Sequence, residues 1–248
     1  MKKLLIVGCG DIGIKLASLL GVNNLQVYGL RRQINDLPEG IIGIAADVTQ
    51  PDSLVPLKAI NFDAVVFCLT PGEASDQRYE QIYVKGSANV LAALNSDCLG
   101  RLIFISSTSV YHQSDNDWVN EESLTEPTRY SGKRLLEAEA LCQHYGEHHN
   151  VSTTMLRFAG IYGPGRLRMV RDVKAGKGST NLYSNRIHRD DCAGVIRHLL
   201  ALPDEQLQPC YIGVDDRPVR INEVKSWLAE QLLSLVHLCR FRRPTLWH

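Results

Sequence analysis

The sequence predicts an α/β fold whose core is a doubly wound parallel sheet. Short apolar runs recur along the chain without the alternation of polar residues that a half-exposed strand shows. Between the runs, apolar residues recur at helical spacing. Strands that alternate with helices in this way form parallel sheets with helices on both faces. The predicted strands are residues 4–7, 25–30, 41–45, 64–69, 102–105, 154–158 and 211–214.

Four amphipathic helices are predicted between these strands. In the first, Ile12, Leu16, Leu19 and Leu20 follow the i, i+4, i+7, i+8 spacing of one helix face. Similar spacing predicts helices that include residues 82–94, 135–141 and 195–200. No internal repeat or low-complexity segment interrupts the alternation, which indicates one α/β architecture.

Composition and charge argue against several classes of protein. The 248 residues carry 27 Lys plus Arg and 27 Asp plus Glu, so the formal net charge is zero. Proteins that bind nucleic acids or membrane surfaces present a basic field, and we expect neither partner. Hydrophobic residues make up 44% of the chain, which is typical of a globular protein rather than a disordered or fibrous one.

Cysteine usage and the amino terminus both favour a cytoplasmic protein. The seven cysteines are an odd number without a C-x-x-C pair, so neither a disulfide framework nor a zinc site is predicted. The apolar run after the first lysines spans about five residues, whereas a secretory signal needs roughly 7 to 15. His144, His148 and His149 have helical spacing, but no carboxylate or cysteine completes a ligand set, so we expect no metal.

A glycine-rich turn follows the first predicted strand directly. The segment Gly8-Cys9-Gly10-Asp11-Ile12-Gly13 is a G-x-G-x-x-G motif that opens the first helix. Gly8 permits the tight turn, Gly10 leaves room for a pyrophosphate, and Gly13 lets the helix pack closely on the strand. Phosphates then lie at the positive N-terminus of the helix, which has Asp11 and Ile12 in its first turn. The strand before and the helix after the turn favour a dinucleotide site over an ordinary glycine-rich loop.

The end of the second predicted strand indicates which dinucleotide is preferred. About 20 residues beyond the glycines, an NAD site carries a carboxylate that accepts from the adenosine 2′-hydroxyl. This chain has Arg31 and Arg32 there, and guanidinium groups suit a 2′-phosphate. We therefore predict NADP as the preferred cofactor, and NAD if these arginines are only solvated. Asp47, after the third strand, is placed either to accept from the adenine amino group or to face a helix N-terminus.

Several further motifs match one known family. They are Asp47-Val48, the fourth strand at residues 63–68, Ser106-Ser107-Thr108-Ser109-Val110-Tyr111, an Arg-Phe-x-x-x-Tyr-Gly-Pro-Gly pattern at residues 157–165, and Ile187-His188-Arg189-Asp190-Asp191. Together with the glycine turn they span nearly the whole chain. The chain resembles an extended, or atypical, short-chain dehydrogenase/reductase of the NAD(P)-dependent epimerase/dehydratase family. The resemblance implies a Rossmann fold with a small C-terminal substrate lobe.

In this family a tyrosine transfers a proton while hydride is exchanged with C4 of the nicotinamide. The resemblance implies that Tyr130 is the acid/base, with Lys133 supplying positive charge and holding the nicotinamide ribose. It also implies that Ser107, with Thr108 as second choice, hydrogen-bonds the reacting oxygen. The implied cofactor contacts beyond the glycine turn and the two arginines are Asp47, Val48, Leu69, Thr70, Ser106, Lys133 and Phe158.

The chain departs from the family at this tyrosine and lysine, which are three residues apart instead of four. Tyr130 can act with Lys133 or with Arg134, since residues three and four apart share a helix face. If Lys133 is instead aligned with the family's lysine, Arg129 falls at the position of the family's tyrosine. Tyr83 stands where the family usually has an asparagine that supports the lysine. Two hypotheses follow: an NADP-preferring oxidoreductase or epimerase/dehydratase, and a nucleotide-binding regulator or scaffold without catalysis.

The substrate side is predicted after the fifth strand and around the Gly-Pro-Gly turn. Arg166 and Arg168 are placed to meet a substrate diphosphate, which suits a sugar or nucleotide-sugar-like small molecule; the alternative is a solvated basic helix face. Tyr111 and His188 are the other predicted substrate contacts, and a structural histidine is the alternative for His188.

The resemblance also implies a division of the chain and a partner. We expect residues 1–158, completed by 187–215, to form the NAD(P)-binding domain, and residues 159–186 and 216–248 to form the substrate lobe. A homodimer would form through the helices at residues 80–94 and 135–145.

Overall fold

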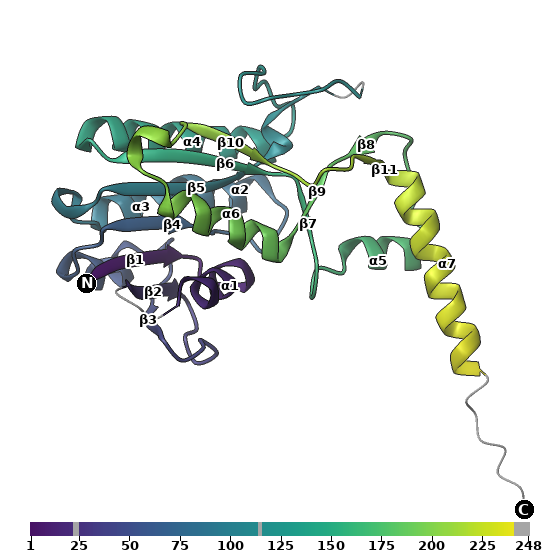
Figure 1. The fold of residues 1–248 in the computed structure, drawn as a ribbon, viewed down its shortest axis with the longest axis horizontal. Helices are drawn as coiled ribbons and strands as arrows, with labels where there is room; N and C mark the ends of the chain where they lie inside the picture. Colours follow the sequence, from purple (N-terminus) through teal and green to yellow (C-terminus); the bar gives the residue numbers. More distant parts are fainter. Residues whose placement is uncertain (22–24, 114–115, 241–248) are drawn as a thin grey trace, which may run out of the picture.

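The computed structural model describes residues 1–21, 25–113 and 116–240 and contains a seven-stranded parallel sheet with helices on both faces (Figure 1). The strand order is β10-β6-β5-β4-β1-β2-β3, and every neighbouring pair is parallel. The predicted doubly wound α/β fold is confirmed. The strands are β1 (Lys2–Val7), β2 (Leu25–Arg31), β3 (Ile41–Ala45), β4 (Ala64–Phe67), β5 (Arg101–Ser107), β6 (Ser152–Phe158) and β10 (Cys210–Gly213).

Alternate residues of the central strands build two apolar cores, one on each face of the sheet. Leu5 and Val7 of β1 belong to one core, whereas Leu4 and Ile6 belong to the other. The second core is covered by α1 (Asp11–Leu20) and α6 (Arg189–Ala201). The first core is covered by the π-helical turn η2 (Glu80–Lys85), α3 (Gly86–Ala93) and α4 (Tyr130–His149). The short helix α2 (Asp76–Tyr79) precedes η2 and has no buried residue.

Two helices begin before their predicted apolar patterns. The helical segment predicted at residues 82–94 starts at Asp76, because the Ser75 side chain accepts from the Arg78 backbone N–H at 3.3 Å and caps the first turn. Helix α4 starts at Tyr130, and its first turn is polar, so the apolar pattern becomes visible only at Leu135. The predicted strand at residues 64–69 ends at Phe67, which leaves Leu69 and Thr70 in the loop that follows.

A smaller group of elements lies beyond the carboxyl ends of the strands (Figure 1). Helix α5 (Arg168–Lys174) contacts α7 (Ile221–Arg240), and β8 (Tyr183–Ser184) pairs antiparallel with β11 (Val219–Arg220). Strands β7 (Gly160–Tyr162) and β9 (Arg186–His188) form a parallel pair. The short 3-10 helices are η1 (Pro51–Ala59), η3 (Ser96–Cys98), η4 (Thr108–Val110) and η5 (Asp204–Gln206).

The division into a cofactor domain and a substrate lobe stays a prediction, and residues 241–248 of that lobe lie outside the described residues. Among the helices that the structure describes, none is long and apolar enough to cross a membrane.

A buried ion pair ties α4 to the sheet. Arg157 of β6 donates through Nη2 to Glu139 Oε2 at 2.6 Å and through Nε to Oε1 at 3.1 Å. The two side chains are only 10% and 4% exposed. Arg157 Nη1 also donates to the Tyr111 hydroxyl at 2.8 Å. Each charge is met by hydrogen bonds, which is the condition under which a buried ion pair is tolerated.

We expect Glu139→Ala to lower the free energy of unfolding by about 3–5 kcal/mol, because the Arg157 guanidinium is left buried without its counter-charge. Urea unfolding at neutral pH measures the change. Glu137→Ala is the control: this exposed carboxylate pairs with Arg134 on the same helix, and its loss costs about 1 kcal/mol or less. Equal small costs for both variants would contradict the structural importance of the buried pair.

Candidate functional site

The glycine turn lies at the end of β1 and is built by close backbone contacts. Gly8 has a φ of +81°, and a Cβ there would lie 2.7 Å from the Cys68 carbonyl oxygen. A Cβ at Gly13 would lie 2.9 Å from Ile6 Cγ2, so helix α1 packs tightly on β1. A Cβ at Gly10 meets nothing closer than the Gly8 oxygen at 3.9 Å. Gly8 and Gly13 are therefore required by the fold, whereas Gly10 borders open space.

Helix α1 begins directly after this open space. Gly10 is its N-cap residue and has no side chain to accept from the first-turn N–H groups. Those N–H groups carry the positive end of the helix dipole. The geometry suits a phosphate or diphosphate placed against Gly10, which is the space that a Cβ would fill.

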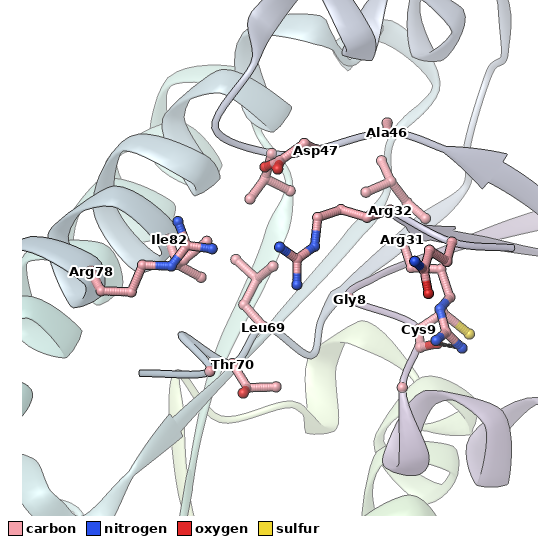
Figure 2. A pocket seen from close by; sticks show the side chains of 15 residues that line it. Gly8, Cys9, Arg31, Arg32, Ala46, Asp47, Leu69, Thr70, Arg78 and Ile82 are labelled. Carbon is pink, nitrogen blue, oxygen red and sulfur yellow. Dashed lines mark hydrogen bonds between the residues drawn. The ribbon is translucent and has the colours of Figure 1, made fainter. Parts of the chain in front are cut away.

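A cavity of about 550 Å³ opens on one side of the glycine turn (Figure 2). Its walls come from the ends of β2, β3 and β4 and from the helical segment after Ser75. The predicted cofactor residues that the structure brings together here are Gly8, Gly10, Arg31, Arg32, Asp47, Val48, Leu69 and Thr70. Arg78 and Ile82 also line the cavity. Sequence reasoning missed both, since no motif marks their segment.

The Asp47 carboxylate is held in a local turn at the top of this cavity. Its Oδ1 accepts from the Thr49 backbone N–H at 2.9 Å and from the Thr49 hydroxyl at 2.8 Å. Burial acts to raise the pKa of Asp47, but the Thr49 hydrogen bonds and the Arg32 and Arg78 guanidinium groups outweigh it and lower this pKa. Asp47 is therefore an ionised acceptor at neutral pH.

A second cavity of about 360 Å³ lies on the other side of the turn. It shares four wall residues with the first cavity, so the two adjoin at the carboxyl edge of the sheet: Gly8, Gly10, Leu69 and Thr70. The other predicted site residues in its wall are Asp11, Ile12, Gly13, Ser106, Ser107, Phe158, Arg166 and Arg168. Tyr79 and Tyr83 also line it, and sequence reasoning assigned neither a contact.

Two serines at the end of β5 face this second cavity. The Ser106 hydroxyl is buried, and it has no hydrogen-bond partner among the described residues. A buried polar group without a partner indicates a site that a ligand or water fills. Ser107 accepts from the Ser109 backbone N–H at 3.1 Å, which fixes its side chain at the strand end.

Three comparisons with known proteins agree with this architecture. The profile of the NAD dependent epimerase/dehydratase family matches residues 4–209. The chain belongs to this family. Protein YeeZ of Escherichia coli K12 is 30% identical over 217 residues, which cover 82% of this chain and 74% of YeeZ. The predicted family resemblance is thus confirmed.

Solved structures are also similar to this chain. One from Methylobacillus flagellatus, assigned as an NAD-dependent epimerase/dehydratase, is 38% identical with a TM-score of 0.78 and covers 93% of this chain and 82% of its own. The UDP-glucuronic acid 4-epimerase of Bacillus cereus, solved with UDP-glucuronic acid and NAD, has a TM-score of 0.75. It is 22% identical, covers 92% of this chain and 82% of its own, and shows the likeness of the fold.

The predicted acid/base pair of this family member, Tyr130 and Lys133, is not among the residues that line the second cavity. Tyr130 begins α4, and its ring meets the Tyr79 ring edge-on with centroids 5.4 Å apart. Lys133 is exposed on the next turn. Arg134, the alternative basic partner, donates from Nε to Asp76 Oδ1 at 2.7 Å and from Nη1 to Glu137 Oε2 at 2.9 Å. The role of Tyr130 and Lys133 stays a prediction.

Tyr79 and Tyr83 occupy the wall between α4 and the loop after β4. The Tyr83 hydroxyl donates to the Leu69 carbonyl oxygen at 3.4 Å, and burial raises its pKa far above the usual value. Burial also raises the pKa of Tyr79, as does the neighbouring Tyr130, while Arg168 partly offsets both effects. Both phenols are therefore neutral hydrogen-bond donors at neutral pH.

The predicted substrate contacts have protein partners of their own. Arg166 donates from Nε and Nη2 to the Asp11 carboxylate at 3.0 and 3.1 Å, so it bridges the second cavity to the start of α1. His188 Nδ1 accepts from the Asp190 backbone N–H at 3.2 Å and caps α6. The Tyr111 hydroxyl is bound by Arg157, and Thr108 begins η4. Within the described chain, no group of three or more His, Cys, Asp or Glu side chains could hold a metal.

We expect Gly10→Ala to fold like the parent protein and to bind NADPH at least about tenfold more weakly, because the new methyl group fills the open space beside α1. Fluorescence titration and a thermal melt measure the two effects. Gly8→Ala is the contrasting variant: the contact with Cys68 and the positive φ lower its stability by about 1–3 kcal/mol. Unchanged NADPH binding by Gly10→Ala would place the dinucleotide elsewhere.

Proposed function

We propose that this epimerase/dehydratase family member is an NADP-preferring enzyme that acts on a sugar or nucleotide-sugar-like small molecule by hydride and proton transfer. The observation that carries the proposal is the pair of adjoining cavities at the glycine turn. One cavity is lined by arginines and the other by serine hydroxyls. A dinucleotide that lies across the turn would put its adenosine end in the first cavity and its nicotinamide end in the second.

The residues of both cavities fit such a cofactor. The open space at Gly10 and the N-terminus of α1, whose N-cap Gly10 has no side chain, accept a pyrophosphate. The Ser106 hydroxyl, which has no partner among the described residues, offers a hydrogen bond in the second cavity. Arg31 and Arg32 supply the charge that a 2′-phosphate requires, and Asp47 accepts from the adenine amino group. When bound, the nicotinamide supplies hydride exchange at its C4 atom.

In the second cavity and beside it, the chain's own residues would orient the substrate and move a proton. Ser107, fixed at the end of β5, would donate a hydrogen bond to the reacting oxygen, with Thr108 as second choice. Tyr130 would transfer the proton, aided by the charge of Lys133. Arg166 and Arg168 would bind a substrate diphosphate, and His188 and Tyr111 would complete the substrate side.

The second candidate is a nucleotide-binding regulator or scaffold without catalysis. It is favoured by the exposure of Lys133 and by Tyr130, which contacts the Tyr79 ring and does not line the second cavity. Tyr83 in the place of the family's asparagine also favours it. Each of these features weakens proton transfer by Tyr130, and none of them involves a residue that lines the first cavity.

A substrate panel separates the two candidates. The purified chain is incubated with NADP or NAD and with UDP- and dTDP-linked sugars, and reduced cofactor is followed by absorbance while products are followed by mass spectrometry. For an enzyme, Ser107→Ala and Tyr130→Phe lower kcat at least about 100-fold and leave NADPH binding within about threefold. Tyr211→Phe is the control, because Tyr211 of β10 lines neither cavity and its hydroxyl contacts the backbone of Gln206 and Gln208. A protein that binds NADPH and turns over nothing in the panel supports the second candidate.

Cofactor preference has its own prediction. We expect Arg31→Ala/Arg32→Ala to lose at least about tenfold in NADPH affinity while NADH affinity changes little, because only NADPH carries the phosphate that these guanidinium groups recognise. Paired titrations measure the ratio. A double variant that still prefers NADPH would remove the arginines from the recognition site.

We also propose that the protein is a cytoplasmic homodimer. The family resemblance supports the dimer, with residues 80–94, in η2 and α3, and residues 135–145 of α4 at its interface. Six cysteines are free thiols, which is compatible with a reducing compartment: Cys9, Cys68, Cys98, Cys142, Cys192 and Cys210.

A further inference from the structure

The first cavity contains a third arginine that no sequence motif marks. Arg78 enters it from α2, across from Arg32 (Figure 2). Its Nε donates to the Pro71 carbonyl oxygen at 3.1 Å, and its Nη1 donates to Gln81 Oε1 at 3.3 Å. These two contacts hold the guanidinium group in place before a ligand binds, which lowers the entropy cost of using it.

The charges in this cavity are not balanced. Three arginines, Arg31, Arg32 and Arg78, and one carboxylate, Asp47, line it, which leaves two positive charges in excess. Throughout the described ranges, no arginine nitrogen lies within 4.0 Å of the Asp47 carboxylate. Asp47 instead binds Thr49 through Oδ1. A cavity with two cations in excess is suited to an anion of similar charge.

We propose that Arg78 is a specificity-determining residue of the cofactor site and acts with Arg31 and Arg32 on a phosphomonoester at the adenosine end. The inference rests on the proposed function. A phosphomonoester carries about 1.5 to 2 negative charges at pH 7, which matches the excess in the cavity. The cofactor's pyrophosphate leaves this excess unused, because backbone N–H groups at the glycine turn accommodate it. Arg78 thus completes the charge recognition from the wall opposite β2.

Two small probes test this assignment on the full chain. Adenosine 2′,5′-bisphosphate and 5′-AMP differ only by the 2′-phosphate, and isothermal titration gives the affinity of each. We expect Arg78→Ala to bind the bisphosphate at least about tenfold more weakly and 5′-AMP within about threefold of the parent. Arg78→Gln keeps a polar side chain without the charge and should show the same selective loss. Arg197→Ala, which removes an exposed arginine of α6, should leave both affinities unchanged.

The outcomes separate this inference from the cofactor preference on which it rests. If the parent prefers the bisphosphate and both Arg78 variants keep that preference, the Arg78 assignment is wrong and the preference stands. An equal loss for both probes in either variant, with unchanged melting temperature, also overturns it and points to purine contact. If the parent binds the two probes equally, the proposed NADP preference fails together with the role of Arg78.

Discussion

The close approach of Gly8 to the end of β4 is the contact on which the site depends. The chain leaves β1 at Gly8, and the Cys68 carbonyl lies where a side chain would begin. Strands β1 and β4 are neighbours, and the strand order reverses between them. The connections that follow these two strands therefore pass to opposite faces of the sheet and leave a crevice. Gly8 and Leu69 line both cavities. A larger residue at Gly8 would push β1 away from β4 and would therefore deform both cavities.

The regular part of the fold was predictable because each central strand carries its own signal. Apolar residues at consecutive positions, such as Leu4 to Val7, require burial on both faces, and only a sheet covered on two sides provides it. Helix starts were less predictable. Helix α4 begins behind Arg129, which provides no side-chain cap, and its first turn has no apolar residue to reveal it. Helix α7 was not predicted, because no strand follows it to fix its place in the alternation.

The candidate site, too, was only partly predictable from the sequence. Gly8, Arg31 and Asp47 were found because each stands at a set distance from a strand end, and parallel strands bring those ends to one edge. Arg78 and Tyr79 follow no strand. They reach the cavities because the loop after β4 leads into α2, which Ser75 caps and which contacts α4. A sequence pattern describes local spacing, and this placement depends on packing between segments far apart in the chain.

Charge pairing explains how a chain with zero net charge can hold a cationic cavity. Arg134, Arg157 and Arg101 each contact a carboxylate: Arg134 meets Asp76, Arg157 meets Glu139, and Arg101 meets Asp204. Arg31, Arg32 and Arg78 of the first cavity contact no carboxylate among the described ion pairs. Each of them nevertheless adds one positive charge to the net charge of the chain, as the paired arginines do. At physiological salt, charges separated by more than about 8 Å in solvent are largely screened from one another. The acidic residues that neutralise the chain as a whole therefore do not neutralise this cavity, and pairing decides which arginines are available to a ligand.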